Sequence, residues 1–248
     1  MSQHSHDALV LLTRDIGEAD RLCILFTREA GKKAARASGV RRPTSRIGGL
    51  LLPWRRVRIE LQERGTSAVI TGAVDTDPQV RDHAMTASFA VLAQTAELLL
   101  RLTEDDEPLP TVFDLLLELR GACIDGLPNP FLFFQLRLLH LLGFLPVTTE
   151  DMRFAHLAPL AQSVVWSCAR GRPLADLCAM PADRTLLQRF VDQLLMDHLN
   201  RPLQSTGIAA DMLCGGERFV FPPHSGDMSV TSPVPVAGRS SGRTPIKL

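Results

Sequence analysis

Several features that mark common protein classes are absent from this 248-residue sequence. Its five cysteines are scattered and never form a C-x-x-C pair, which argues against a disulfide framework and against a zinc ribbon. No run of about 18 uncharged apolar residues occurs. The opening segment MSQHSHDALV is polar, so the sequence predicts neither a membrane span nor a secretion signal. We therefore expect a cytoplasmic protein.

Sequence-local catalytic motifs are missing as well. The chain has no G-x-S-x-G, G-x-x-x-x-G-K-S/T, G-x-G-x-x-G or H-E-x-x-H pattern, which weakens an assignment as an enzyme. The pair His4 and His6 favours a solvated terminus over a metal site. His156, Cys168 and Cys178 match no usual zinc-ligand spacing. We therefore predict no catalytic residues, no metal and no cofactor.

Positive charge is present and strongly segregated. The whole chain has 27 basic and 27 acidic residues, yet residues 28–58 contain ten basic side chains and the single acid Glu29. Such clustering indicates a polyanionic partner, either nucleic acid or a membrane surface, and a solvated basic loop is the alternative. The acidic run at residues 104–107 indicates an exposed helix end or loop rather than a general-acid pair or a cation site.

The first 75 residues have the pattern of short strands separated by turns. Five strands are predicted, at residues 8–14, 21–29, 32–38, 51–62 and 66–74. The fourth alternates most clearly, with Val57, Ile59 and Leu61 on one face and polar or charged residues on the other. Five antiparallel strands of this length predict an OB-type barrel. The basic segment covers strand three, the following loop and strand four, so we expect its charge on one side of the barrel.

Helical patterns follow Asp77. A buried stripe with helical spacing is predicted from Met85, Phe89, Leu92, Ala96 and Leu99. Residues 131–142 predict a helix that is apolar nearly all round, and residues 183–200 predict an amphipathic helix. A capping box is predicted at residues 111–114 and an N-cap at residue 183. Residues 147–181 mix hairpin and helix signals and are left unassigned. The predicted class is α+β, with an OB-fold barrel at residues 1–78, a helical domain at 79–213 and a disordered tail at 214–248.

The segment DIGEADRLCILFTREAGKKAARASGVRRPTSRIGGLLLPW resembles the start of bacterial RecO proteins, a family of DNA repair and recombination mediators. The similarity continues more weakly in FQLRLLHLLGFLP (134–146) and RFVDQLLMDHLNRPLQS (189–205). The residues that match the first pattern are Glu18, Asp20, Leu25, Phe26, Thr27, Gly31, Ala37, Gly39, Arg41, Arg42, Ser45, Arg46, Gly48, Gly49, Leu51, Pro53 and Trp54.

The resemblance implies a non-enzymatic, nucleoid-associated protein. Such proteins bind single- and double-stranded DNA, anneal complementary strands, and with RecR help to load RecA onto strands coated by single-stranded DNA-binding protein. Membranes are not among the expected partners. The DNA-binding candidates are Lys32, Lys33, Arg36, Arg41, Arg42, Arg46, Arg55 and Arg56. The candidates for binding the acidic, apolar tail of single-stranded DNA-binding protein are Arg137 and Arg189.

The sequence departs from the family pattern at three places. Ser38 stands where the family has a lysine, Gln204 and Thr206 replace basic residues, and the four-cysteine zinc module that many members carry after the position of Pro146 is absent. Phe26 and Trp54 are the only aromatic residues among the first 80, so platforms for base stacking are scarce. We therefore expect a grip on phosphates, which suits annealing. An OB-fold factor that binds RNA or the ribosome is the main alternative, and an enzyme with dispersed catalytic groups is a distant third.

Overall fold

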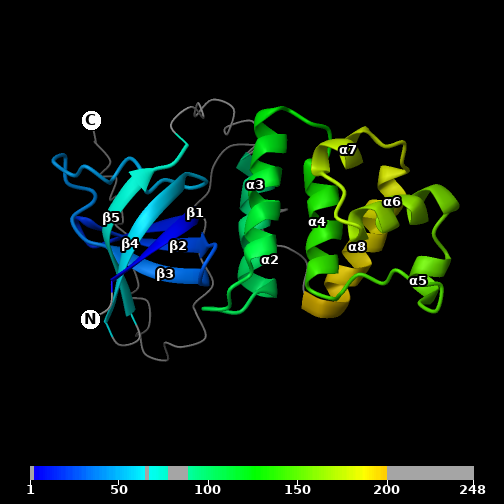
Figure 1. The fold of residues 1–248 in the computed structure, drawn as a ribbon, viewed down its shortest axis with the longest axis horizontal. Helices are drawn as coiled ribbons and strands as arrows, with labels where there is room; N and C mark the ends of the chain where they lie inside the picture. Colours follow the sequence, from blue (N-terminus) through cyan, green and yellow to red (C-terminus); the bar gives the residue numbers. More distant parts are fainter. Residues whose placement is uncertain (1–2, 65–66, 78–88, 200–248) are drawn as a thin grey trace, which may run out of the picture.

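The structure is a computed structural model that describes residues 3–64, 67–77 and 89–199. Figure 1 shows the strands at one end of the molecule and the helices at the other, with α2 and α3 next to the strands. The strands are β1 (Gln3–Ile16), β2 (Asp20–Thr27), β3 (Gly31–Ala37), β4 (Arg56–Arg64) and β5 (Ser67–Asp75). The helices are α2 (Phe89–Leu102), α3 (Pro110–Ile124), α4 (Pro130–Leu141), α5 (Met152–Ala155), α6 (Pro159–Ala169), α7 (Leu174–Ala179) and α8 (Arg184–Leu199).

The five strands form a closed barrel in the order β1-β2-β3-β5-β4. Neighbouring strands are antiparallel except for the short parallel pairing of β3 with β5, where Ala35 lies opposite Ala68. The predicted alternation of β4 is confirmed, because Val57, Ile59 and Leu61 are buried in the barrel interior. The chain therefore has the predicted OB-type barrel followed by helices.

The predicted start of the fourth strand is wrong. Residues 51–55 form turns, and β4 begins only at Arg56. Trp54 has a φ of 65°, a backbone region that costs a residue with a side chain on the order of 1–3 kcal/mol. Its amide donates to the Val10 carbonyl at 2.6 Å, so the chain folds back onto β1 before the strand begins. The alternation of residues 56–62 could not reveal this interruption.

The β1 strand is buried on both sides. Ala8 and Val10 belong to the barrel interior, whereas Leu9 and Leu11 on the outer side belong to the core that the helices share. Phe26 from β2 and Trp54 join that second core. A strand covered on both faces reads as a continuous apolar run, which explains the sequence ALVLL. One outer face of the barrel is thus covered by helices.

Most helix predictions hold, and two details differ. Phe89, predicted to be buried, is 45% exposed at the start of α2. The helix at 131–142 is confirmed as α4, and the Asp183 carboxylate accepts from the Leu186 amide at 3.0 Å, as its capping role requires. The capping box at residues 111–114 is wrong, because α3 already begins at Pro110, and Asp114 instead pairs with Arg28. Proline suits the first helical position because it needs no amide hydrogen bond there. Met85 lies outside the described residues, as does the predicted tail.

The unassigned stretch between residues 147 and 181 is helical. It contains α5, α6 and α7, and no strand occurs in it. Pro159 starts α6, and Pro173 precedes α7. The hairpin signal is misleading because α5 and α7, with four and six residues, are too short to show a repeating apolar face. None of the helices in the described ranges is long and apolar enough to cross a membrane.

Gly31 marks a close approach between the barrel and the helices. A Cβ atom at Gly31, whose φ is +65°, would lie 1.8 Å from the Glu107 carbonyl oxygen. Gly17 has a similar φ of +56° but no atom within 4 Å of its Cβ position. We predict that Gly31→Ala lowers the free energy of unfolding by clearly more than Gly17→Ala, which should cost about 1 kcal/mol for backbone strain alone. Equal losses in urea unfolding would contradict this close approach.

Candidate nucleic-acid interface

The β1–β2 turn (residues 17–19) lies against residues 38–50 of the β3–β4 loop (residues 38–55), and we call these two segments the loop surface. The Arg41 amide donates to the Ala19 carbonyl at 2.9 Å, and Arg41 Nη1 donates to the Gly17 carbonyl at 3.0 Å. The Gly39 amide donates to Asp20 Oδ1 at 2.7 Å. Figure 1 shows much of the β3–β4 loop at the end of the barrel away from the helices. The two segments therefore form one exposed surface.

Arginines outnumber acids on and beside the loop surface by six to three. The arginines are Arg14, Arg21, Arg36, Arg41, Arg42 and Arg46, and the acids are Asp15, Glu18 and Asp20. Arg14 and Arg36 also share the outer face of the barrel, because both lie opposite Leu22 in the strand register. In OB folds this face of strands two and three, with the adjoining loops, commonly binds oligonucleotides.

Arg42 and Arg46 are exposed and form no hydrogen bond or ion pair through their side chains with the described residues. Arg36 and Arg41 are instead paired, Arg36 with Asp20 and Arg41 with Asp15. The Gly39 amide and the Arg36 guanidinium hold the pKa of Asp20 below its usual value. Exposed ion pairs contribute only about 0–1 kcal/mol, so a phosphate can replace such a carboxylate at little cost.

Lys32 and Lys33 lie at the junction with the helices instead. Lys32 is 7% exposed, and its ammonium donates to the Thr103 carbonyl at 2.6 Å and to the Leu100 carbonyl at 3.2 Å at the end of α2. Lys33 Nζ lies 2.7 Å from Asp106 Oδ1. Burial alone would lower the pKa of Lys33, but its hydrogen bonds to Asp106 and Glu63 raise it above its usual value. We therefore assign Lys32 a structural role.

Arg55 and Arg56 lie apart from the loop surface. Arg56 makes a two-pronged contact with Asp7, at 3.1 Å and 2.7 Å, and Arg55 Nη1 lies 3.6 Å from Asp75 Oδ2. The β5 strand separates β4 from β3 in the closed barrel. The expectation of a single basic side is therefore wrong, because the segment divides between the loop surface, the helix junction and β4. Exposed Arg14 and Arg58, absent from the candidates, have no side-chain partner among the described residues.

Both aromatic residues of the barrel are buried. Phe26 is fully buried and Trp54 is 4% exposed, and each packs in the core shared with the helices. Neither ring can stack on a nucleic-acid base in this structure. The expected lack of stacking platforms therefore holds for the described part of the barrel.

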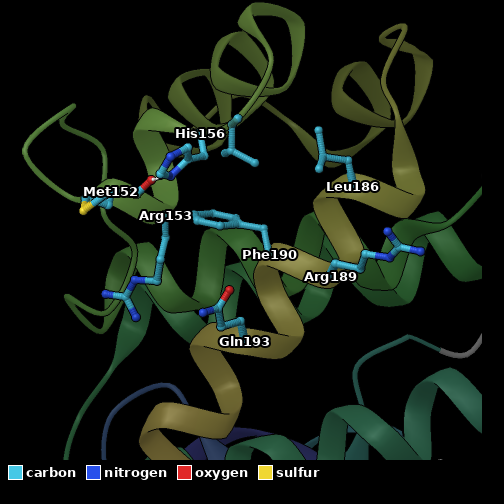
Figure 2. A pocket seen from close by; sticks show the side chains of 8 residues that line it. Met152, Arg153, His156, Leu186, Arg189, Phe190 and Gln193 are labelled. Atoms are coloured by element: carbon cyan, nitrogen blue, oxygen red, sulfur yellow. Dashed lines mark hydrogen bonds between the residues drawn. The ribbon is translucent and has the colours of Figure 1, made fainter.

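A second candidate site is a pocket of about 310 Å³ between α5 and α8. Its lining includes Leu157, Leu186 and Phe190, and Figure 2 shows Arg153 and Arg189 on opposite sides of Phe190. Arg189 is exposed and its side chain has no hydrogen-bond or ion-pair partner in the described ranges. The pocket thus combines apolar side chains with an available cation at its rim.

Two other arginines of the helical region, Arg153 and Arg137, form ion pairs with acids. The hydrogen bond from Arg153 lowers the pKa of Asp151 to about 2, and Arg153 also contacts Asp197. Arg137, predicted beside Arg189, is only 12% exposed and pairs with Glu118 between α3 and α4. Arg137 therefore does not line the pocket. The sequence offered no signal for Arg153 because α5 is only four residues long.

The cysteine chemistry gives no support to a metal site. Among the described residues, no group of three or more histidine, cysteine or acidic side chains is arranged to hold a metal ion. Burial raises the pKa of Cys168 to about 12 and also raises the pKa of Cys178. Because metals bind the thiolate, these environments disfavour ligation.

The same burial predicts slow thiol chemistry. Burial raises the pKa of Cys23 from 9.0 to about 11, which lowers its thiolate fraction at pH 8 by about a hundredfold. We predict that alkylation of Cys23 and Cys168 at pH 8, followed by peptide mass spectrometry, is at least that much slower in the native chain than in urea. Equal rates in the two states would contradict the buried environments.

The closed barrel followed by helices makes this an OB-fold protein with an attached helical domain. A family model described as recombination protein O, N terminal, matches residues 1–78. The DNA repair protein RecO of Pelotomaculum thermopropionicum is 33% identical over 217 residues, which cover 84% of this chain and 81% of the relative. The chain belongs to the RecO family of DNA repair proteins.

Two further relatives carry the same name. The DNA repair protein RecO of Myxococcus xanthus is 36% identical over 152 residues, covering 59% of this chain and 61% of the relative. The DNA repair protein RecO of Syntrophobacter fumaroxidans is 32% identical over 142 residues, covering 56% of this chain and 57% of the relative. These two alignments span less than two thirds of each relative.

Proposed function

We propose that this protein is a DNA-binding mediator of repair and recombination that holds DNA through the loop surface. The observation that carries the proposal is the pair of exposed, unpaired arginines, Arg42 and Arg46, on an OB barrel of a RecO family member. Arg36 and Arg41 lie beside them in ion pairs that a phosphate can replace. Lys32 is left out because its charge is buried.

The loop surface binds DNA mainly through the phosphate backbone. Guanidinium groups bind phosphate oxygens through two parallel hydrogen bonds. The two aromatic residues of the barrel are buried and cannot stack on bases. Phosphate contacts position a strand without reading its sequence, so the base edges remain available to a complementary strand. This arrangement supports binding of single- and double-stranded DNA and annealing of complementary strands.

The α5–α8 pocket is the proposed dock for the acidic, apolar carboxy-terminal tail of single-stranded DNA-binding protein. Leu157, Leu186 and Phe190 supply apolar contacts, and Arg189 supplies the cation that an acidic tail requires. Together with RecR, such docking would bring RecA to strands coated by that protein, as the family resemblance implies.

The two proposed sites lie at opposite ends of the molecule. Figure 1 shows much of the β3–β4 loop at one end and α5 at the other, with α3 and α4 between them. DNA on the loop surface therefore leaves the pocket open. This separation supports a ternary complex in which one chain holds a DNA strand and the tail of its coating protein together.

For the loop surface, we predict that Arg42→Ala with Arg46→Ala weakens binding to unrelated single strands to a similar extent. The slope of log affinity against log salt should become shallower by about 1.4, which corresponds to two lost phosphate contacts. Fluorescence anisotropy with labelled oligonucleotides measures both quantities. The matched control, Arg170→Ala with Arg172→Ala, removes the same charge between α6 and α7 and should leave the slope unchanged.

Two results would contradict this assignment. One is an affinity for single-stranded DNA that hardly depends on salt in the unsubstituted protein. The other is an equal loss of affinity in both double variants. Preference for structured RNA, without annealing activity, would instead favour the RNA-binding alternative.

For the pocket, we predict that Arg189→Glu weakens binding of a synthetic acidic peptide with an apolar carboxyl end by at least about tenfold, because it replaces attraction with repulsion. Arg172→Glu makes the same charge change away from the pocket lining and should change the affinity by less than about twofold. Isothermal titration calorimetry measures both. Peptide binding that survives Arg189→Glu would remove the pocket from the proposal.

A further inference from the structure

Arg120, on α3, is a buried cation that joins the helices to the β3–β4 loop. The residue is 5% exposed, its Nε donates to the Trp54 carbonyl at 3.0 Å, and its Nη1 donates to Asp77 Oδ2 at 2.7 Å. One side chain of the helical domain thus holds the end of the loop and the residue two positions after β5. Because the guanidinium is buried, it cannot itself contact a DNA phosphate.

Trp54 is the point at which the loop is held. Its φ of 65° places it in a backbone region that a tryptophan keeps only when the surrounding structure fixes it. The indole packs in the core shared with the helices, and the amide donates to the Val10 carbonyl. The other backbone polar group of Trp54, its carbonyl, accepts from Arg120.

A chain of contacts leads from Trp54 back to the arginines of the loop surface. Leu51, three residues earlier, is buried in the barrel interior, and its carbonyl accepts from Arg21 Nη1 at 3.2 Å. The Leu51 amide donates to the Ile47 carbonyl at 3.2 Å, next to Arg46. The position of the Trp54 backbone therefore affects the placement of the preceding loop.

We propose that Arg120 is a positioning residue that acts through Trp54 to place Arg42 and Arg46 for DNA, without touching DNA. This inference rests on the proposed function and adds that a residue of the helical domain affects the affinity of the barrel for DNA. The role requires a guanidinium group, because its Nε and Nη1 atoms donate to two different partners, Trp54 and Asp77.

The test uses Trp54 as its own reporter. The chain has two tryptophans, so a Trp166→Phe background leaves only Trp54 emission. In that background, Arg120→Gln is compared with Arg137→Gln, which removes the charge of another largely buried arginine on α4. Emission wavelength, acrylamide quenching and affinity for single-stranded DNA at several salt concentrations are measured at a temperature at which circular dichroism shows native structure.

We expect Arg120→Gln to shift Trp54 emission to longer wavelength, to weaken DNA binding by about tenfold and to make the salt dependence shallower. Arg137→Gln should change none of these by comparable amounts. If Arg120→Gln does not fold, Arg120→Lys, which keeps the charge but not the fork, should show the same changes to a smaller degree.

Two results would overturn the positioning role. One is an Arg120→Gln variant with red-shifted Trp54 emission but unchanged DNA affinity. The other is an Arg120→Gln variant with lower DNA affinity but unchanged Trp54 emission and quenching. Failure of the Trp166→Phe parent to bind DNA would contradict the proposed function instead. Trp54 emission alone would then decide whether Arg120 holds the loop.

Discussion

Burial of the outer face of β1 and β2 against the helices is the constraint on which the rest of this structure depends. Leu9, Leu11 and Phe26 point out of the barrel and would be exposed without α2 and α3. Fully burying side chains of this size contributes about 1.5–3 kcal/mol each. The same contact takes one outer face of the barrel away from solvent, whereas the loop surface stays exposed at the other end.

The junction also decides the role of several positive charges. Lys32 binds carbonyls at the end of α2, where a cation is favoured by the helix dipole, and Arg28 pairs with Asp114 on α3. The described helical region, residues 89–199, has fourteen acidic and eight basic residues. Residues 1–77 have the opposite excess, with nine acidic and thirteen basic residues. Part of the segregated charge therefore attracts the two regions to each other, and only the remainder is available to a polyanion.

The sequence predicted the barrel and most helices well, because alternation and helical spacing are local properties. It could not predict how the basic segment is neutralised, since the partners come from distant positions. Arg56 pairs with Asp7, 49 residues away, and Arg36 with Asp20, 16 residues away. Arg189 lies beside an apolar helix and lines the pocket, whereas Arg137 has the same local pattern but is buried against Glu118. Helical spacing alone does not distinguish an arginine at the rim of a pocket from one buried between two helices.

We propose that DNA binds the loop surface and not the helical domain or the outer face of β4. Hydrogen–deuterium exchange of the whole chain, with and without a single-stranded oligonucleotide, tests it most directly. We expect slower exchange at residues 17–19 and 38–50 when the oligonucleotide is bound, with little change in α5, α8 or β4. Protection centred on α5 and α8 or on β4, with none in the β3–β4 loop, would contradict it.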